Sequence, residues 1–523
     1  MSRVALNSLI RAVAVRSVTG PRDREVQSIH YDSRTVQPDG LFVAVPGLRT
    51  DGSRFVDEAI TRGAAVVVAE IPLHPTYPGV TVVQVENARR ALAWISAEFW
   101  GHPSRRLFMV GITGTNGKTT TAYLIESIFQ QAGFPVGVIG TINYRFGGKH
   151  FPGTVTTPES ADLMRILWEM VHAGVTHVVL EVSSHAIDLE RVAACEFDVG
   201  IFTNLSQDHL DYHGDMATYW QCKKRFFVDH LSTGTKSGRT VAVLNADDRH
   251  GRELAREISV KTLRTGSGSD CDIRSEDVKV DITGTTATIR TPQASFKLKS
   301  PLVGKHNVHN VLSATGAGIV GGVPASRIRE GLGRLANVPG RLESVPNQRG
   351  LAILVDYAHT PEALENVLSA LKNLTTGRLI TVFGCGGDRD KMKRPIMGKI
   401  AARLSDRCVI TTDNPRTESP LGILGDIEAG AAATEEMVKY EAGELLLSRN
   451  GKAYAIEPDR KRAIELGVRM TRPGDCLLIA GKGHETYQIV GTETLPFDDR
   501  VEVRQALERV SQAQGGQESI REG

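Results

Sequence analysis

The central part of the chain alternates between short apolar runs and glycine-rich turns that lead into amphipathic stretches. The first unit is LFMVGIT, residues 107–113, followed by GTNGKTTTAYLIESIFQQAG, in which Gly133 marks the end of a helix. Similar apolar runs recur as PVGVIGT, THVVLEVSS, EFDVGIFTNLS and TVAVLNADD, and we predict a helix from about Pro158 to His172. This pattern predicts a mostly parallel sheet covered by helices.

The segments on either side have patterns of their own. Residues 1 to about 100 mix the apolar runs LFVAVPG, AAVVVAE and VTVVQV with an amphipathic helix, NARRALAWISAEFW, and end near Gly101 and Pro103. After Val338-Pro339-Gly340, four apolar runs each lead into a polar loop: LAILVDYAHTPE, LITVFGCGGDRD, CVITTDNPR and CLLIAGKGHE. We therefore predict an α/β protein of three domains, residues 1–106, 107–338 and 339–523. The central domain has a P-loop-type, mostly parallel sheet, and the C-terminal domain is Rossmann-like.

Composition and charge narrow the classes of function. The chain of 523 residues has 62 Lys and Arg against 60 Asp and Glu, a formal net charge of +2, so no overall field favours nucleic acid. The six cysteines lie far apart without a CxxC pair, which predicts reduced, mostly buried thiols. No stretch approaches a membrane span, and we expect a cytoplasmic protein and a monomer.

The sharpest motif is GTNGKTT, which comprises Gly114, Thr115, Asn116, Gly117, Lys118, Thr119 and Thr120 and lies between a predicted strand and a predicted helix. That context is typical of a phosphate loop, in which backbone N–H groups and the helix N-terminus hold phosphate oxygens. Lys118 can neutralise the phosphate charge and Thr119 can bind Mg²⁺. The motif is a variant, because Ile112 occupies the position of its usual first glycine.

Polar residues follow the other predicted strands of the central domain. Glu181 ends one of them, and Asp208 and His209 follow another. A carboxylate at a strand end can hold a metal ion. Mg²⁺ prefers oxygen ligands, so His209 is an unusual but possible ligand.

In the third domain, every polar loop follows a strand, where ligands bind in such sheets. These loops contain GCGGDRD with Arg389, DNPR at residues 413–416, and GKGHE at residues 481–485. Arg side chains can form forked hydrogen bonds with carboxylates or phosphates. We therefore predict a binding site at these loops.

The order of the motifs GTNGKTT, EVSSH, FTNLSQDHLDYHG, LNADD, GKHNVHN, DYAHTP, FGCGGDRD, DNPR and AGKGHE resembles that of the Mur ligases of peptidoglycan synthesis. The resemblance extends from about Asp32 to Arg500 and is strongest to the branch that adds meso-diaminopimelate to UDP-MurNAc-L-Ala-D-Glu. It implies an N-terminal UDP-sugar-binding domain, a central ATP-binding domain and a C-terminal domain that binds the amino acid. It also implies that ATP converts the D-Glu carboxylate into an acyl phosphate, which an amine then attacks.

The resemblance implies roles for individual residues. ATP would contact the phosphate loop together with Asn307, Arg341 and Asp356. Thr119 and Glu181 would hold one Mg²⁺ and His209 another. Members of the family carry a carbamylated lysine, and the spacing of Lys223-Lys224-Arg225-Phe226-Phe227 favours Lys223, with Lys224 as the neighbouring alternative. The catalytic residues implied are Lys118, Lys223 and His209, and Lys223 is also an implied metal ligand.

The two other substrates are also assigned by resemblance. The UDP-MurNAc-dipeptide would bind Tyr31, Ser33, Leu48, Arg49, Thr50, Thr156, Thr157, Ser183 and Arg191. Diaminopimelate would bind Arg389, Asp413, Asn414, Pro415, Arg416, Gly481 and Glu485. Arg416 and Arg389 would bind the distal carboxylate that lysine lacks.

Three alternatives stay open at this point. A lysine-adding Mur ligase is the nearest, although it would be expected to lack Arg416. A folylpolyglutamate-synthase-like ligase shares the phosphate loop, but the DSR segment at residues 32–34 and the DNPR segment argue against it. A nucleotide-gated binding or scaffold protein without ligase activity is the third.

Overall fold

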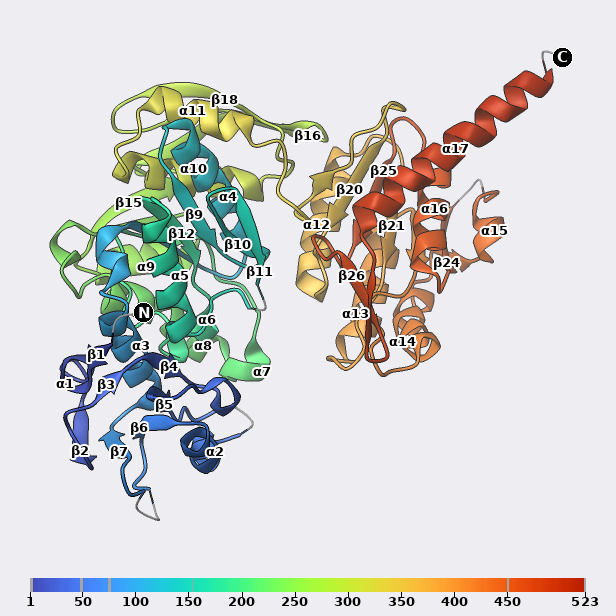
Figure 1. The fold of residues 1–523 in the computed structure, drawn as a ribbon. Coiled ribbons are helices and arrows are strands. Elements are labelled where there is room, and N and C mark those ends of the chain that lie inside the picture. Colours follow the sequence, from blue (N-terminus) through green and yellow to red (C-terminus); the bar gives the residue numbers. More distant parts are fainter. Residues whose placement is uncertain (1–2, 48–49, 74–76, 154, 449–450, 522–523) are drawn as a thin grey trace. The chain divides into compact units, whose positions relative to one another are not determined.

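The computed structural model describes residues 3–47, 50–73, 77–153, 155–448 and 451–521 (Figure 1). The chain divides into two compact units. Unit 1 comprises Met1–Glu276, Thr288–Lys297 and His309–Arg334, and unit 2 comprises Asp277–Ala287, Leu298–Val308 and Leu335–Gly523.

The N-terminal sheet of unit 1 has the strand order β2-β7-β6-β5-β4. The strands are β2 (Val15–Thr19), β4 (Ser28–His30), β5 (Gly40–Val43), β6 (Ala64–Ala69) and β7 (Thr81–Val85). Strands β4 to β7 run parallel to their neighbours, and β2 is antiparallel to β7. The short pair β1 (Val4–Ala5) and β3 (Glu25–Val26) and the helices α1 (Leu6–Leu9), α2 (Val56–Thr61) and α3 (Ala88–Phe99) complete this region. Leu6 and Leu9 of α1 are buried in its core.

The central sheet of unit 1 has β8 (Phe108–Thr113) between β12 (His177–Glu181) and β13 (Val199–Phe202). On one side β12 pairs with β9 (Val136–Ile139), which continues into the antiparallel strands β10 (Asn143–Phe146) and β11 (Lys149–Pro152). On the other side β13 is followed by β14 (Val241–Asn245), β15 (Lys261–Gly266) and β16 (Ile273–Asp281). Each described pairing along the order β9-β12-β8-β13-β14-β15-β16 is parallel, so the carboxyl ends of β8, β12 and β13 lie at the same edge of the sheet.

The helices that accompany this sheet are α4 (Lys118–Gln131), α5 (Ser160–His172), α6 (Ser184–Asp188), α7 (Leu210–His213), α8 (Met216–Arg225), α9 (Arg249–Glu257), α10 (His306–Val320) and α11 (Ala325–Arg334). Single turns of other helix types are η1 (Ser33–Thr35), η2 (Gly52–Phe55), η3 (Pro103–Arg106), η4 (Phe226–His230) and η5 (Ser237–Arg239). The predicted helix from about Pro158 to His172 corresponds to α5.

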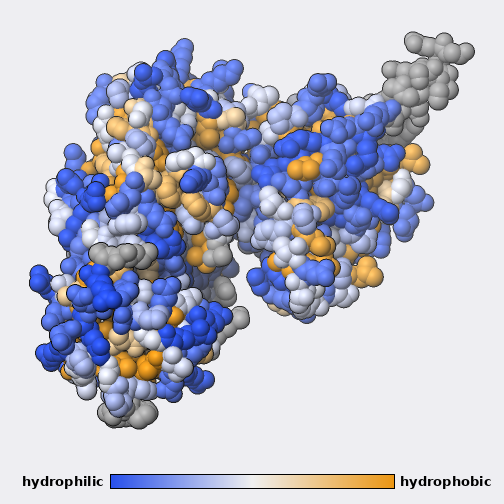
Figure 2. All heavy atoms as spheres, viewed as in Figure 1, coloured by the Kyte–Doolittle hydropathy of each residue, from blue (hydrophilic) through white to orange (hydrophobic). Residues whose placement is uncertain are grey.

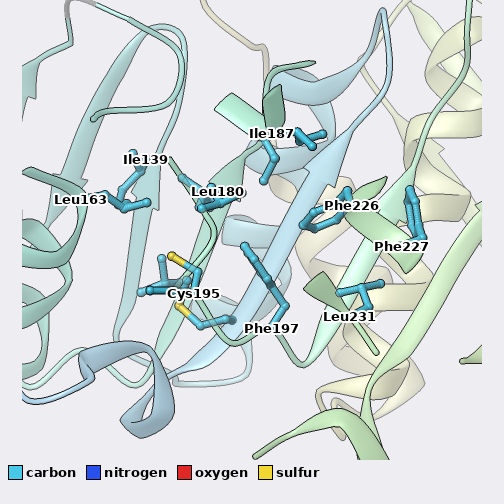
Figure 3. Close-up of a cluster of buried hydrophobic side chains, with 14 of the residues drawn as sticks. Ile139, Leu163, Leu180, Ile187, Cys195, Phe197, Phe226, Phe227 and Leu231 are labelled. Atoms are coloured by element: carbon cyan, nitrogen blue, oxygen red, sulfur yellow. The ribbon is translucent and has the colours of Figure 1, made fainter. Parts of the chain in front are cut away.

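A core of buried aliphatic and aromatic side chains fixes the central sheet (Figure 3). Strands β12, β13 and β14 are buried at every position, which explains their unbroken apolar sequence. Gly111 in β8 is needed because a Cβ there would lie 2.5 Å from the ring of Phe226. Phe226 and Phe197 pack edge to face beside it, with ring centroids 5.0 Å apart.

The boundary between the units passes through β16, β17 (Gly284–Arg290), β18 (Ser295–Ser300) and α10. Two residues, Ile282 and Thr283, connect β16 to β17, a connection that antiparallel strands allow.

Unit 2 contains a second large sheet with the order β19-β20-β25-β21-β22-β24-β23. The strands are β19 (Glu343–Ser344), β20 (Ala352–Asp356), β21 (Leu379–Phe383), β22 (Arg407–Ile410), β23 (Met437–Lys439), β24 (Lys452–Ile456) and β25 (Cys476–Ala480). Only β19 is antiparallel to its neighbour among the described pairs. The helices are α12 (Pro361–Leu374), α13 (Lys393–Leu404), α14 (Pro420–Ala432), α15 (Ala442–Leu445), α16 (Arg460–Met470) and α17 (Asp499–Arg521), and a hairpin is formed by β26 (Tyr487–Val490) and β27 (Glu493–Pro496).

The predicted α/β fold class is confirmed: the mostly parallel central sheet contains β8, which leads into the predicted phosphate loop, and a second, Rossmann-like sheet follows later in the chain. The boundaries at residues 106/107 and 338/339 stay predictions. The six cysteines all lie in the described ranges and are buried and unpaired, as expected.

The visible face of each unit is mostly hydrophilic, with smaller hydrophobic areas (Figure 2). None of the helices in the described ranges has the length and apolar character needed to cross a membrane.

Candidate functional site

The predicted phosphate loop connects β8 to α4 in unit 1. Gly114 has φ +140°, and a Cβ there would lie 2.0 Å from Thr203 Oγ1. Gly117 has φ +87° and directly precedes α4, where a Cβ would lie 2.3 Å from Asn310 Oδ1. Both positions therefore require glycine. Lys118, the first residue of α4, donates hydrogen bonds to the carbonyl oxygens of Gly114 (2.9 Å) and Thr115 (2.8 Å).

Side chains that follow β13 hold the phosphate loop in place. Asn204 Oδ1 accepts a hydrogen bond from the Asn116 N–H (2.9 Å), and Thr203 Oγ1 donates to the Asn116 carbonyl (2.7 Å). The hydroxyl groups of Thr115 and Tyr219 are hydrogen-bonded at 3.2 Å. The loop is thus preorganised, with its backbone and a helix N-terminus at the edge of the sheet.

The Glu181 carboxylate lies at the end of β12 and is only 2% exposed. It accepts hydrogen bonds from Thr119 Oγ1 (3.0 Å), Thr141 Oγ1 (2.9 Å) and the Thr141 N–H (3.2 Å). A buried carboxylate beside two hydroxyl oxygens is a donor set that suits Mg²⁺, which keeps waters and phosphate oxygens as its other ligands. Thr141 was not selected from the sequence, although its position directly after the PVGVIG run marked another strand end.

Lys223, in α8, is 1% exposed, and its Nζ donates to the Gly114 carbonyl oxygen at 3.0 Å. Nζ also lies 4.5 Å from the centroid of the Tyr219 ring. Burial lowers the pKa of Lys223 well below its usual range, and the charge of Lys118 lowers it further. Lys224 differs, because its ammonium forms an ion pair with Glu257. Of the two lysines, Lys223 therefore has the environment of a neutral, nucleophilic amine.

His209 precedes α7 with φ +53° in the left-handed region. Its Nε2 lies 3.5 Å from Asp208 Oδ2, and its ring centroid is 5.0 Å from that of His185 and 6.2 Å from that of Tyr219. Tyr219 therefore lies between His209 and the phosphate loop, because its ring is near His209 and its hydroxyl bonds to Thr115.

A cavity of about 310 Å³ lies elsewhere in unit 1, with Tyr31, Tyr144, Asp162, Arg165 and Arg191 among its lining residues. Tyr31 donates a 2.5 Å hydrogen bond to Asp162 Oδ2. Burial and this carboxylate raise the pKa of Tyr31. Arg191 Nε lies 3.4 Å from Glu159 Oε2, and Arg191 Nη1 donates to the Thr157 carbonyl (3.0 Å). The cavity therefore combines an aromatic hydroxyl and two arginines with the carboxylates of Glu159 and Asp162, a lining that suits a polar ligand.

The other residues predicted to bind the UDP-sugar lie near this cavity or in the N-terminal region. Thr157 donates to the Glu181 carbonyl oxygen (2.7 Å) and accepts from the Ser183 N–H (3.1 Å). Thr156 and Thr141 hydroxyls are 3.2 Å apart. Ser33 donates to Glu58 (2.7 Å), and Thr50 is exposed. Leu48 and Arg49 lie outside the described residues.

Asn307, Arg341 and Asp356, the further ATP contacts expected from the resemblance, belong to unit 2. Asn307 Nδ2 donates to the Val303 carbonyl (2.8 Å). The Arg341 guanidinium lies 5.1 Å from the Tyr357 ring centroid. Asp356 accepts hydrogen bonds from the N–H groups of Leu342 (2.7 Å) and Ala358 (2.8 Å). Burial raises the pKa of Asp356, and Arg341 opposes that shift.

The DNPR and GKGHE loops of unit 2 form one buried polar network. Asn414 Nδ2 donates to Glu485 Oε2 (2.9 Å), and the Ile489 N–H donates to Asn414 Oδ1 (3.0 Å). Lys482 Nζ donates to Asn414 Oδ1 (3.0 Å) and lies 3.2 Å from Glu485 Oε2. Gly481 has φ +116°, and a Cβ there would lie 3.0 Å from Asp413 Oδ2. Lys482 was not selected from the sequence, although the GKGHE motif contains it.

Arg416 lies beside this network in the left-handed region, with φ +51°. Its backbone N–H donates to the Ile489 carbonyl oxygen (3.1 Å), and its Nη1 donates to the Gly387 carbonyl oxygen (2.7 Å). Pro415 is buried, and a Cβ on Gly387 would lie 1.9 Å from its carbonyl oxygen. Arg389, on the GCGGDRD loop, is exposed, and its Nη1 donates to the Asp388 carbonyl (2.9 Å). The loops that carry the residues predicted to bind the amino acid thus come together from the ends of separate strands.

Comparison with known families gives matches along most of the chain. Residues 112–318 match the Mur ligase middle domain, and residues 340–483 match the Mur ligase, glutamate ligase domain. Residues 25–100 match the model described as Mur ligase family, catalytic domain.

Individual proteins are similar over nearly their whole length. The chain is 45% identical over 506 residues to the UDP-N-acetylmuramoyl-L-alanyl-D-glutamate--2,6-diaminopimelate ligase of Geobacter metallireducens, covering 97% of this chain and 99% of that one. It is 41% identical over 493 residues to the protein of the same name from Bacillus licheniformis, covering 94% and 97%. A solved structure with that name aligns with a TM-score of 0.70 and 29% identity, covering 98% of this chain and all of the other.

Proposed function

The chain belongs to the Mur ligase family, and we propose that it is the ATP-dependent ligase that joins meso-diaminopimelate to UDP-MurNAc-L-Ala-D-Glu in peptidoglycan precursor synthesis. The observation that carries the proposal is the convergence of Lys118 and Lys223 on the phosphate loop, beside the Glu181 and Thr119 pair. Such a cluster is suited to a phosphoryl transfer. The relatives named for this activity support the choice of substrates.

The reaction joins two groups that do not react unaided. A D-Glu carboxylate oxygen attacks the γ-phosphorus of ATP, and the P–O bond to ADP breaks, which leaves an acyl phosphate. The amine of diaminopimelate then attacks the acyl carbon, and the tetrahedral species expels phosphate and loses a proton to give the amide. Lys118 neutralises charge on the transferred group, and backbone N–H groups of the loop bind its oxygens.

Mg²⁺ would be held by Thr119 and Glu181, with His209 and a carbamylated Lys223 as ligands of a second ion. Bound Mg²⁺ would shield phosphate charge. The carbamate would form when the neutral Lys223 amine attacks CO₂ with release of one proton. That turns a cationic side chain into an anionic oxygen donor. The burial of Lys223 and its lowered pKa support this assignment over Lys224.

For the UDP-MurNAc-dipeptide, we assign the cavity lined by Tyr31 and Arg191 together with Thr156, Thr157 and Ser183. The assignment extends to Ser33, Leu48, Arg49 and Thr50. Arg191, which lines the cavity and pairs with Glu159, would bind a phosphate or carboxylate group of the substrate. Asn307, Arg341 and Asp356 remain our proposed additional contacts to ATP.

For diaminopimelate, we assign the network of the DNPR and GKGHE loops. Arg416, with Arg389, would bind the distal carboxylate, and Asp413, Asn414 and Glu485 would receive the distal amino group. Pro415 and Gly481 hold these loops in shape. Lysine has the distal amino group but no distal carboxylate. Arg416 is therefore the residue that would select diaminopimelate over lysine.

The proposal is tested by phosphate release and product mass, measured with ATP, Mg²⁺ and UDP-MurNAc-L-Ala-D-Glu against diaminopimelate, lysine and ornithine. We expect release only with the dipeptide substrate, ATP and an amino acid together, and a strong preference for diaminopimelate. A preference for lysine would favour the lysine-adding Mur ligase instead. ATP binding without amide formation would favour the binding-protein alternative.

Cytoplasmic localisation and a monomeric state stay predictions from the sequence.

A further inference from the structure

Lys482 lies at the centre of the network in unit 2, although the roles assigned above do not use it. Its side chain is 0% exposed. Its Nζ donates to Asn414 Oδ1 (3.0 Å) and Glu485 Oε2 (3.2 Å) and lies 3.5 Å from Asp413 Oδ1. One buried ammonium therefore contacts all three side chains assigned to the amino group of diaminopimelate.

The backbone on both sides of Lys482 is tightly constrained. Gly481 and Gly483 have φ values of +116° and +55°, and a Cβ on Gly483 would lie 2.7 Å from Tyr357 Cβ. The Gly481 N–H donates to the Asp356 carbonyl (3.1 Å), and the Glu485 N–H donates to the Lys482 carbonyl (3.0 Å). These contacts therefore fix the position of the Lys482 Cα relative to the ends of β20 and β25.

Charge counting shows what the ammonium contributes. Asp413 and Glu485 are two carboxylates close to one cation, so this group carries one unmatched negative charge. The neighbouring Arg460 does not change the balance, because it forms two 2.8 Å hydrogen bonds with Asp499, and both side chains are 0% exposed. Two carboxylates this close together, of which Asp413 is buried, would repel each other without a cation. With Lys482 present, the group has the charge that binds a single ammonium.

The hydrogen bonds also determine which buried acceptor stays available. Asn414 Oδ1 is occupied by Lys482 and the Ile489 N–H, and Glu485 Oε2 by Lys482 and Asn414. Asp413 Oδ1 is buried and accepts no hydrogen bond from any residue in the described ranges. A buried acceptor left without a donor is costly unless a ligand supplies one.

We propose that Lys482 is a positioning residue for the amino acid: it orders Asn414 and Glu485 and leaves Asp413 as the acceptor for the substrate's ammonium group. This inference rests on the proposed function, since it assigns a role within the same amino-acid site.

The test uses the full-length enzyme with the variants Lys482→Met and Lys482→Gln. Both remove the charge, and the Gln amide keeps a donor for Glu485. The matched control is Lys236→Met, which removes another buried lysine. Lys236 is 2% exposed and binds Asp198 (2.6 Å) and the Ser104 carbonyl (2.9 Å), away from every residue assigned to a substrate. Thermal unfolding and the KM values for diaminopimelate and ATP are measured for all three.

We expect both Lys482 variants to raise the KM for diaminopimelate by about tenfold or more, while the KM for ATP changes by less than about twofold. The control should lower the unfolding temperature and leave both KM values unchanged. An unchanged KM for diaminopimelate in either folded Lys482 variant would overturn the inference. So would a parallel rise in both KM values. If the unaltered enzyme does not use diaminopimelate at all, the proposed function itself fails, which is a separate result.

Discussion

Lys118 and Lys223 donate hydrogen bonds to the same oxygen atom, the Gly114 carbonyl, at 2.9 and 3.0 Å. The two lysines come from α4 and α8 and are 105 positions apart in the chain. Burial disfavours the charged form of an ammonium group, and two ammonium groups this close also repel each other. The less exposed of the two, Lys223, is therefore the one driven towards the neutral amine.

The first prediction concerns the two adjacent lysines of α8. Lys223→Arg should abolish amide formation, with a loss of at least about a thousandfold, because a guanidinium stays protonated and cannot take up CO₂. Lys224→Arg should keep nearly full activity, since the replacement can retain the ion pair with Glu257. Phosphate release under saturating substrates measures both. Equal losses in the two variants would show that the assignment to Lys223 is wrong.

The second prediction concerns the choice of amino acid. Arg416→Ala removes a charge-assisted contact to the distal carboxylate of diaminopimelate, which costs about 2 to 3 kcal/mol, or roughly a hundredfold in KM. The KM for ATP should persist near its original value. Arg403→Ala is a suitable control, because that exposed arginine pairs with Glu365 on the surface. A KM for diaminopimelate that does not change would remove the specificity argument.

The third prediction concerns Tyr219, whose hydroxyl is bonded to Thr115 of the phosphate loop. Tyr219→Phe removes that bond but keeps the ring beside Lys223. We expect the KM for ATP to rise by roughly fivefold, the equivalent of about 1 kcal/mol. Tyr212→Phe is the matched control, since its hydroxyl binds Asp188 instead. Equal effects of the two substitutions would contradict a role for Tyr219 in holding the loop.

The fourth prediction concerns stability at acid pH. Burial lowers the pKa of His177 to about 4, from 6.5 in its unperturbed state. Between these values the unfolded chain binds more protons than the folded one, so His177 makes the protein less stable as pH falls from 6.5 towards 4. His177→Phe should weaken that pH dependence, because a phenyl ring can keep the stacking on Phe134. The exposed His150→Gln should leave it unchanged. Denaturant unfolding at pH 4.5 and at pH 7 gives the free energy of unfolding at each pH, and the difference between the two is compared among the variants.

The sequence determined the local features of this protein. Apolar runs such as residues 177–181 predict buried strands because a strand covered on both faces has no position for a polar side chain. Glycines at 114 and 117 indicate a turn that only glycine can adopt. The ordered motifs then indicated the family and, by resemblance, predicted Arg416 and the neighbouring loop residues as the binding site for diaminopimelate. These features depend on residues close together in the chain.

The tertiary structure decided which distant residues meet. Lys223 differs from Lys224 because α8 buries the Lys223 side chain and directs Lys224 to Glu257. Two adjacent lysines in a sequence do not show which of them is buried. Thr141 joins Thr119 on the Glu181 carboxylate because β9, β12 and β8 end at one edge of the sheet. Lys482 reaches Asn414 across 68 positions for the same reason in unit 2. Charge and burial act through space, so their effects on these groups follow from packing and not from spacing along the chain.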